Sequence, residues 1–426
     1  MINVYNNYAS IDNIFLKISI VLVCLIPFGM ALGGLFPEIF LLLSFSLLFR
    51  DIYKNKEKYL KNKFVFFFFI FYFYILFNSL IQNLSYFNNI KDYFFDQKSI
   101  IFFFRYIFYF ILIWYLFDVL KTFKKIFFYS VAITISIISI DALFQYFSDV
   151  NLVGIRRVNA HRLSGIFGDE YILGSYLLRI YFILLPLFFY FFELKNKKNL
   201  YIYILINLFF CIIIFLSGER TAFYLLIITI FLTFFILEEL NLKIFFQTIM
   251  VLFSAIIVLI LSDSKIEQRM INTTYDDFFN KKSKKVYIFT KIHHDHYLSA
   301  KLMFRDNFLI GIGPKMFKVE CKKSKYSYFK NRCENHPHNY YVQIFTETGI
   351  LGGLLIAFLF CIIFYNFLIL LFKVNKTENW NKILAICFLI LLFPFAPHGN
   401  VFNNWIIVMN ILPLSLCYHF KYISKN

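Results

Sequence analysis

Residues 64–81 read FVFFFFIFYFYILFNSLI, a run without a single charged side chain. A helix of about 20 apolar residues spans the hydrocarbon core of a bilayer, so this run predicts a membrane-spanning helix. Comparable runs recur along all 426 residues, of which 60% are hydrophobic and only 16% charged. Soluble domains average about 45–50% apolar and about 25% charged residues. The composition therefore predicts a polytopic membrane protein and excludes a soluble enzyme or a disordered chain.

Twelve segments have this apolar character, and they predict an all-α integral membrane protein with about twelve transmembrane helices. The first segment lacks a basic leading region and a small-residue cleavage site, so we interpret it as a span and not as a signal peptide. The segments are 14–33, 35–49, 64–81, 100–120, 126–147, 176–192, 200–216, 221–237, 244–261, 341–372, 382–397 and 403–420.

The orientation follows from the Lys and Arg residues of the short connections, which collect on the cytoplasmic side. One alternating set of connections, which includes 50–63 and 421–426, carries 18 of these residues, and the other set carries six. We therefore predict that both termini are cytoplasmic. An even number of spans agrees with this arrangement.

Residues 262–340 form a long loop on the opposite, outer side. The loop divides the chain into a first block of spans (1–261), the loop itself, and a second block of spans (341–426). It holds 16 Lys or Arg against 8 Asp or Glu. An anionic ligand would explain this excess, and a solvated surface without a ligand is the alternative. No soluble basic domain or recognition motif accompanies it, so we expect no nucleic-acid partner.

Cysteine usage separates two groups. Five of the seven cysteines lie inside predicted spans, where a thiol acts as a small apolar side chain. Cys321 and Cys333 lie in the outer loop, where an oxidising compartment would allow a disulfide. Two unpaired thiols are the alternative. The chain has no CxxC motif, so a zinc ribbon or redox site is not indicated.

The densest polar signal is HPHNYYVQIFTETGILGG at residues 336–353. Asn339, Gln343 and Glu347 are spaced by four, so they share one face of a helix. A polar stripe that enters an apolar span must face a cavity or a partner, because lipid cannot satisfy it. His338 stands at the start of this helix and could remove a proton from a hydroxyl group. A hydrogen-bonded helix cap is the alternative interpretation.

A second signal is the short turn LSGERTA at residues 216–222, which holds Arg220. The planar guanidinium group suits a phosphate, which it can bind through two hydrogen bonds. A salt bridge with Glu219, or snorkelling to the membrane surface, is the alternative. The run HHDH at 293–296 suggests a metal, but a further ligand at suitable spacing is missing. We therefore expect no metal site.

Taken in this order, residues 160–400 resemble the O-antigen ligase and polymerase superfamily. Residues 338–352 are similar to its motif H-N-x-x-L-Q-x-x-x-E-x-G-x-x-G, and the turn at Arg220 is similar to its Ser-x-x-Arg segment. Asn307 to Gly313 resembles its D-x-P-x-x-G-x-G segment, with Phe308 in place of the usual Pro. Residues 162–165 resemble its R-x-S-G element.

The resemblance implies a fold of the GT-C kind in the bacterial inner membrane. It implies transfer of a glycan from undecaprenyl pyrophosphate at the periplasmic face, without a metal or cofactor. A ligase would transfer the glycan to lipid A-core, a polymerase to a second lipid-linked glycan, and an oligosaccharyltransferase to a protein. We favour the ligase. A transporter is the alternative from another class, and Arg105 and Asp141 are its best intramembrane candidates.

Residue roles follow from the same resemblance. His338 would be the general base, and Arg220 would hold the pyrophosphate leaving group. Ligases of the superfamily use a second loop arginine, but His293 and His296 occupy its usual place and Arg269 lies further upstream, which leaves this position open. The residues expected to bind substrate are Arg162, Arg269, His293, His296, Asn339, Gln343 and Glu347.

Overall fold

The computed structural model describes residues 14–83, 100–120, 122–237, 240, 242–280, 285–286, 289–326, 333–372 and 379–423. Most of the connection 82–99, and residues 373–378 and 424–426, which contribute to the predicted orientation, lie outside these ranges. The first block contains α1 (Ile14–Cys24), α2 (Ile26–Leu32), α3 (Leu35–Lys54), α4 (Lys56–Leu60), α5 (Lys63–Asn83), α7 (Arg105–Val119), α8 (Phe123–Ser148), α9 (Leu173–Phe191), α10 (Lys197–Leu216), α11 (Arg220–Ile236) and α12 (Leu242–Ser262).

The described residues of the long connection 262–340 are folded and not extended. They contain α13 (Ser264–Glu267), a π-helical turn (Gln268–Asn272), α14 (Thr273–Phe278), the strands β1 (Phe279–Asn280) and β2 (Lys285–Val286), α15 (Lys291–Asp306) and α16 (Phe317–Glu320). The two strands pair in antiparallel fashion. The last block contains α17 (Tyr340–Phe372), α18 (Asn379–Leu391) and α19 (Asn404–Ile423).

The protein is a multi-pass membrane protein of the all-α class. Each of the twelve predicted segments contains helix in the described part of the chain, but the helix in 382–397 ends at Leu391. Within that part, seven helices are long and apolar enough to cross a membrane, or eight if the bent pair α1–α2 counts as one span. Helices α11 and α18 are apolar but shorter. The number twelve and the three-part division of the chain therefore stay predictions.

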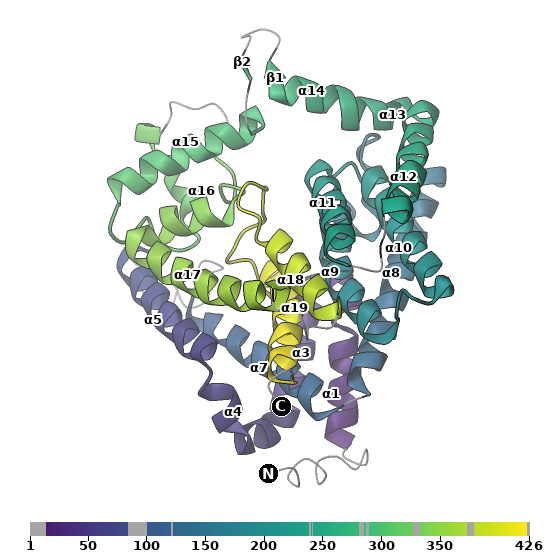
Figure 1. Ribbon diagram of the computed structural model, residues 1–426. Coiled ribbons are helices and arrows are strands. Elements are labelled where there is room, and N and C mark those ends of the chain that lie inside the picture. Colours follow the sequence, from purple (N-terminus) through teal and green to yellow (C-terminus); the bar gives the residue numbers. More distant parts are fainter. Residues whose placement is uncertain are drawn as a thin grey trace.

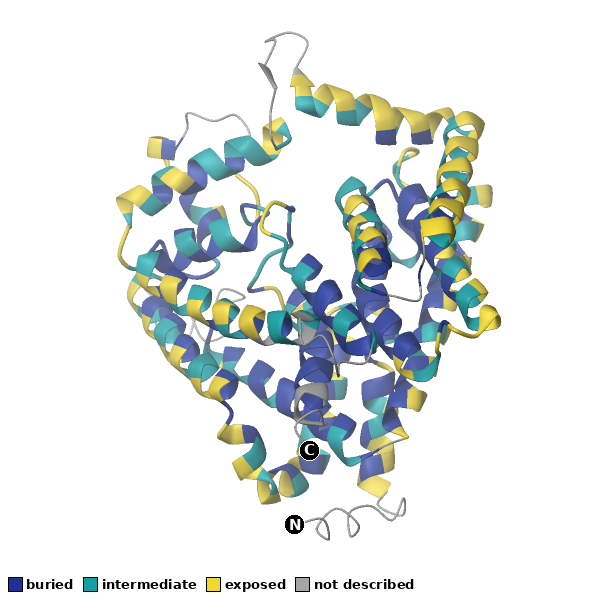
Figure 2. Ribbon diagram, viewed as in Figure 1, coloured by how far each residue is buried: buried dark blue, intermediate teal, exposed yellow. Residues whose placement is uncertain are grey.

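The folded loop and helix α4 lie at opposite ends of the molecule (Figure 1). Helices α13 to α15 form the upper end of this view, whereas α4 and the start of α1 lie at the lower end. The centre is buried and the flanks are exposed (Figure 2). In the most apolar stretch of α9, 89% of the residues are buried, whereas in that of α12 only 11% are buried. Helix α9 packs against α18, and α19 packs against α7.

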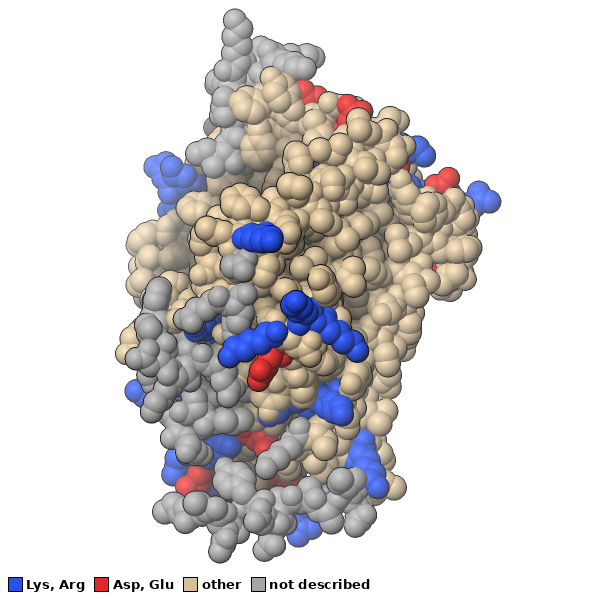
Figure 3. Space-filling view, turned by 45° about the vertical axis from the view of Figure 1, so that its right-hand side comes forward, with Lys and Arg blue, Asp and Glu red and all other residues tan. Residues whose placement is uncertain are grey.

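The exposed flanks are apolar, as expected of a surface in contact with lipid. Large side chains of α12 are among the most exposed, including Leu261 at 82% and Met250 at 72%. Figure 3 shows a broad uncharged area in the upper part of the face turned to the viewer. Lys and Arg gather mainly in the lower half of this face.

The two intramembrane charges that a transporter would need are held by protein partners. The guanidinium group of Arg105 donates to both carboxylate oxygens of Glu38, each at 2.9 Å, and so ties α7 to α3. The carboxylate of Asp141 accepts from the amide of Asn151 at 3.2 Å and from the backbone N–H of Leu152 at 3.0 Å. Both charges therefore serve to join elements of the fold.

A kink in α17 provides the place where the loop after α15 docks. Gly349 has φ +67°, so the helix breaks there and frees carbonyl groups of the preceding turn. The loop after α15 bonds to them: the N–H of Ile312 donates to Thr346 at 3.1 Å, and the N–H of Gly313 donates to Glu347 at 2.9 Å. The loop thus satisfies backbone groups that lipid could not.

This contact requires glycine on the loop side as well. Gly311 has φ +75°, and a Cβ at this position would lie 2.5 Å from the backbone nitrogen of Gly349. Only a residue without a side chain lets the two backbones approach this closely. The glycines of the D-x-P-x-x-G-x-G-like segment therefore dock the loop onto α17. A disulfide between Cys321 and Cys333, with a Cα–Cα distance of 5.3 Å, closes the next part of the loop.

Candidate active site

Four histidines converge at the upper end, and we call them the histidine cluster: His293, His296, His336 and His338. His293 and His296 lie one turn apart on α15, whereas His336 and His338 lie in the segment before α17. The ring centroid of His338 is 4.2 Å from that of His336, 5.2 Å from His293 and 5.4 Å from His296. Folding thus gathers residues that are 45 positions apart in the sequence, from His293 to His338.

The histidine cluster is electrically neutral near pH 7. Burial, and then repulsion from His338 once that ring is protonated, lowers the pKa of His293 and of His296 to about 4. The same two causes lower the pKa of His336 to about 3. Burial also lowers the pKa of His338 from its ordinary value. A neutral imidazole has a free ring nitrogen that can accept a proton, which is the state a general base needs.

His338 is held in a strained backbone conformation. Its φ is +57°, which costs energy for a residue with a side chain, and such strain persists only where the surroundings impose it. The loop between α18 and α19 supplies the restraint. The backbone N–H of His398 donates to the carbonyl of His338 at 2.8 Å, and a ring nitrogen of His336 lies 3.2 Å from the carbonyl oxygen of His398.

The three polar residues of the helix face that follows make bonds within the protein. Asn339 caps α17: its side-chain oxygen accepts from the N–H groups of Tyr341 and Val342 at 3.0 and 3.1 Å. Its side-chain amide donates to the carbonyl of Pro394 at 2.7 Å. The cap joins the start of α17 to the loop that also restrains His338.

Gln343 and Glu347 continue this network further into the helix. The amide of Gln343 donates to Glu347 at 3.1 Å, and its oxygen accepts from the N–H of Val401 at 3.0 Å. The carboxylate of Glu347 accepts from the N–H groups of Lys315 and Phe317 at 3.0 and 3.1 Å. These contacts hold two loops against α17. A direct role of these residues in substrate binding stays a prediction.

Three arginines gather beside the histidine cluster, and we call them the arginine cluster: Arg162, Arg220 and Arg269. Arg220 begins α11, and its guanidinium group donates to Asp277 at 2.7 Å and to Thr274 at 3.1 Å. Its ion-pair partner is thus Asp277 of α14, and not the neighbouring Glu219. Arg269 donates to the carbonyl of Gly218 at 3.1 Å.

The charges of the arginine cluster act on one another. Burial and then the charges of Arg220 and Arg162 lower the pKa of Arg269 to about 10. Burial also lowers the pKa of Arg162, and the charge of Arg220 adds to this effect. A site in which cations repel one another gains stability when an anion enters. The charge of Arg220 also contributes to the lowered pKa of His293, so the two clusters lie within electrostatic reach of each other.

Arg269 lies in the π-helical turn between α13 and α14. Such turns are rare and frequently occur at functional sites. The sequence left the second arginine open, and the structure brings Arg269 together with Arg220. Sequence reasoning missed Asp277 and Thr274 as the partners of Arg220, because nothing local links them across more than 50 residues.

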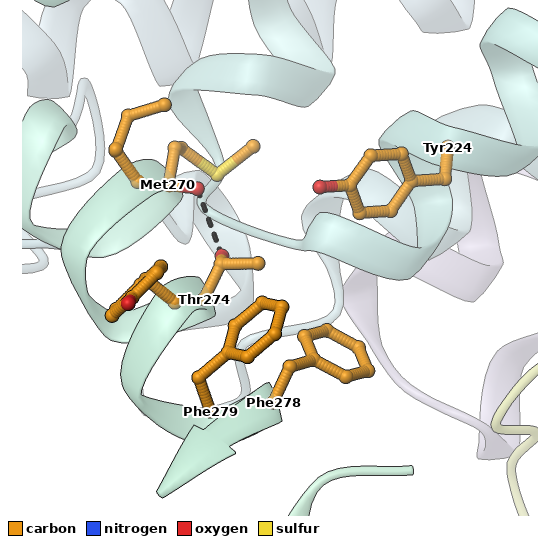
Figure 4. Close-up of a pocket in the computed structure, with 7 residues that line it drawn as sticks. Tyr224, Met270, Thr274, Phe278 and Phe279 are labelled. Atoms are coloured by element: carbon orange, nitrogen blue, oxygen red, sulfur yellow. Dashed lines mark hydrogen bonds between the residues drawn. The ribbon is translucent and has the colours of Figure 1, made fainter. Parts of the chain in front are cut away.

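An apolar groove of about 430 Å³ adjoins the arginine cluster (Figure 4). The rings of Tyr224, Phe278 and Phe279 surround it in this view, and Thr274, which accepts from Arg220, lies at its wall. The lining residues are Tyr224, Met270, Ile271, Thr274, Tyr275, Phe278 and Phe279. Within the described ranges, no group of three or more His, Cys, Asp or Glu side chains is placed to hold a metal ion.

The fold and the site define a polytopic membrane protein whose upper end combines neutral histidines with clustered arginines. Residues 205–357 match the family model described as O-antigen ligase. This match confirms the resemblance drawn from the motifs: over these residues the chain is similar to the O-antigen ligase family. The matched region contains the histidine cluster, Arg220 and Arg269, whereas Arg162 precedes it. No curated protein matches the chain.

Proposed function

We propose that this protein is an O-antigen ligase-like glycosyltransferase. It transfers a glycan from undecaprenyl pyrophosphate to lipid A-core at the periplasmic face of the bacterial inner membrane. The observation that carries the proposal is the juxtaposition of a neutral histidine cluster with three partly buried arginines. Neither cluster alone indicates transfer, but together they provide a proton acceptor and an anion site at one end of a membrane protein.

His338 acts as the general base in this proposal. A ring nitrogen takes the proton of the acceptor hydroxyl as its oxygen attacks the anomeric carbon of the donor sugar. The bond between that carbon and the pyrophosphate oxygen breaks, and the pyrophosphate leaves with the electron pair. Its negative charge is held by the arginine cluster. A pyrophosphate is a good leaving group, so the residues supply positioning, proton removal and charge stabilisation.

The apolar groove supports a lipid-linked donor. The groove adjoins the arginine cluster through Thr274. A phosphate bound to the arginine cluster would therefore place an attached hydrocarbon chain at the entrance of the groove. Its apolar lining suits part of an isoprenoid tail. With the folded loop in the periplasm, α4 and the start of α1 lie on the cytoplasmic side, which agrees with the cytoplasmic termini that the distribution of Lys and Arg predicts.

The test is the surface glycan of a strain whose only copy of the gene encodes His338→Ala. We expect the polymeric glycan to disappear from lipid A-core and to accumulate on the lipid carrier. His161→Ala is a matched control, because His161 lies exposed at the same end but outside the histidine cluster. Immunoblots of membrane fractions establish that each variant reaches the membrane.

Three other outcomes separate the alternatives. A core that carries a single repeat would indicate a polymerase. Loss of glycan from a protein, with lipid A-core unchanged, would indicate an oligosaccharyltransferase. A wild-type profile would remove His338 as the base and favour transport.

A further inference from the structure

Arg179 is the only charged residue in the span α9. It lies six residues after the start of the helix, or about 9 Å along its axis. Only 9% of its surface is exposed. A charged side chain inside a membrane span is costly and usually marks a functional position or a buried ion pair.

Arg179 has no ion pair within the described residues. One terminal nitrogen donates to the carbonyl of Ser175 at 3.0 Å, and the guanidinium carbon lies 5.9 Å from the ring centroid of Trp405. Its Nε is buried and makes no hydrogen bond to any described residue. Arg105, by contrast, is neutralised by Glu38 in the same part of the molecule. The fold thus pairs one intramembrane arginine and leaves the other without a counter-charge.

Two further polar side chains are also unsatisfied, and one of them, His398, lies in the loop that leads to Trp405. Its neighbour Gly399 lies against Ile406, the residue after Trp405. The rings of His398 and Tyr340 stack with centroids 4.2 Å apart, and 6% and 1% of these residues are exposed. Neither ring nitrogen of His398, nor the hydroxyl of Tyr340, makes a hydrogen bond of normal geometry to a described residue, although the backbone of Leu391 lies near the His398 ring. Burial and then the charge of Arg179 lower the pKa of His398 to about 3, so His398 is neutral. An unsatisfied buried polar group is destabilising, and a ligand that bonds to it would recover that loss.

These residues connect directly to His338. The backbone of His398 bonds to both His338 and His336, as described above, and Tyr340 follows His338 by two positions. The arginine cluster reaches the histidine cluster by a different route, through the charge of Arg220 on His293. His338 is thus hydrogen-bonded to the loop that holds His398, whereas the charge of Arg220 acts on its neighbour His293.

We propose that Arg179, His398 and Tyr340 form a second anion site, which binds a phosphate or carboxylate group of the acceptor. The assignment to the acceptor rests on the proposed function, since the arginine cluster already serves the donor pyrophosphate. The Arg179 guanidinium group supplies the charge and a planar fork of donors. Neutral His398 and the Tyr340 hydroxyl each supply one further donor. Bound there, the anion fixes the acceptor so that its hydroxyl group meets His338.

A binding experiment tests the site without any transfer. The chain has three tryptophans, so the variant Trp114→Phe/Trp380→Phe leaves Trp405, beside Arg179, as the only one. The detergent-solubilised protein is titrated with inorganic phosphate and, separately, with acetate at constant ionic strength. We expect a saturable change in Trp405 emission with at least one anion, and the responding anion identifies the group. Arg179→Gln abolishes the change and Arg220→Gln retains it.

The unfolding temperature of Arg179→Gln provides a second readout. Removing an uncompensated buried charge leaves the temperature unchanged or raises it, whereas removing a structural contact lowers it. A lowered temperature, an absent Trp405 response, or an identical response in Arg179→Gln would each overturn the proposal.

Steady-state transfer tests the assignment to the acceptor. Arg179→Gln raises the KM for lipid A-core at least about tenfold, the effect of losing one charged contact, and leaves the KM for the donor unchanged. Phosphatase-treated and carboxyl-methylated acceptors show which group is recognised. An unchanged acceptor KM would overturn the assignment. If the wild-type protein transfers no glycan but Trp405 still responds through Arg179, the proposed function fails and the anion site stands.

Discussion

Two polar clusters at opposite ends of the molecule differ in how completely their hydrogen bonds are satisfied. At the lower end, Asp118 accepts from His419 at 2.6 Å through one oxygen. Its other oxygen lies 2.6 Å from the amine of Lys58 and accepts from the hydroxyl of Tyr59 at 3.1 Å. The second ring nitrogen of His419 lies 2.8 Å from the amine of Lys124. Every member of this cluster has a protein partner.

The histidine cluster at the upper end is open by comparison. Both ring nitrogens of His296 and one of His336 lack a hydrogen-bond partner among the described residues. Both clusters are buried, so burial alone does not distinguish them. The difference teaches that a closed polar cluster joins helices, whereas an open one keeps donors and acceptors available for a substrate.

Asp118→Ala should produce the largest effect, and the effect should be on stability. The substitution leaves cations buried without their counter-charge, which costs about 3–5 kcal/mol of unfolding free energy. Denaturant unfolding of the purified protein measures the loss. Asp51→Ala is the control, because Asp51 is more exposed and lies 3.9 Å from Lys54, a pair worth about 0–1 kcal/mol. Equal losses in the two variants would contradict the view that the lower cluster joins helices.

Arg220→Gln should affect transfer and not stability. Loss of one group that stabilises the leaving charge typically lowers the rate about 10²–10³-fold. Its partner Asp277 is 32% exposed, so water can replace the ion pair. Arg305→Gln, a change at an exposed arginine of α15, is the control for the general loss of a positive charge. If Arg220→Gln unfolded easily and each folded molecule retained full transfer, Arg220 would be structural.

The helices could be predicted from the sequence because the length of an apolar run is a local property. The motif around His338 and the turn at Arg220 were also local signals, and the family match confirms the resemblance they suggested. The partners of polar side chains are not local. Glu347 bonds to Phe317, 30 residues away, and Asn339 bonds to Pro394, 55 residues away.

The sequence therefore indicated which residues lie at the upper end. It did not indicate which partners these residues bond to. Arg179 is a different case, because a local signal was present. It is the only charge in the run 176–192, yet only Arg105 and Asp141 were singled out as intramembrane charges. Its missing counter-charge became visible only when α9 was packed against its neighbours.

Asn339→Ala should have a smaller effect, on stability. Removing a helix cap costs about 0.5–2 kcal/mol, typically about 1. Asn339→Ser restores most of the loss, since serine caps equally well. Transfer per folded molecule should change only a few-fold in both variants, because the Asn339 side chain bonds to protein groups. A serine variant that folds like the wild type but transfers more than about tenfold slower would place Asn339 on the substrate.

The pH dependence of transfer should show the smallest effect. An ordinary histidine, with a pKa of about 6.5, would be about three-quarters protonated at pH 6, and a base of that kind would lose about fourfold in rate between pH 8 and pH 6. Burial lowers the pKa of His338, so the neutral base persists to lower pH. We therefore expect a loss smaller than fourfold over this range, measured in detergent with saturating donor.

Protein stability sets the lowest pH at which transfer can be measured. The direction in which stability changes with pH follows from the lowered histidine pKa values. The folded pKa of His296 is about 4, below the ordinary value, so the unfolded chain binds more protons between pH 6.5 and 4. Stability is full above pH 6.5 and falls as the pH decreases through this window. His296→Gln should flatten the fall. A fourfold loss of rate by pH 6 with the protein still folded would mean that the base titrates like an exposed histidine, and the histidine cluster would then be more solvated than the structure shows.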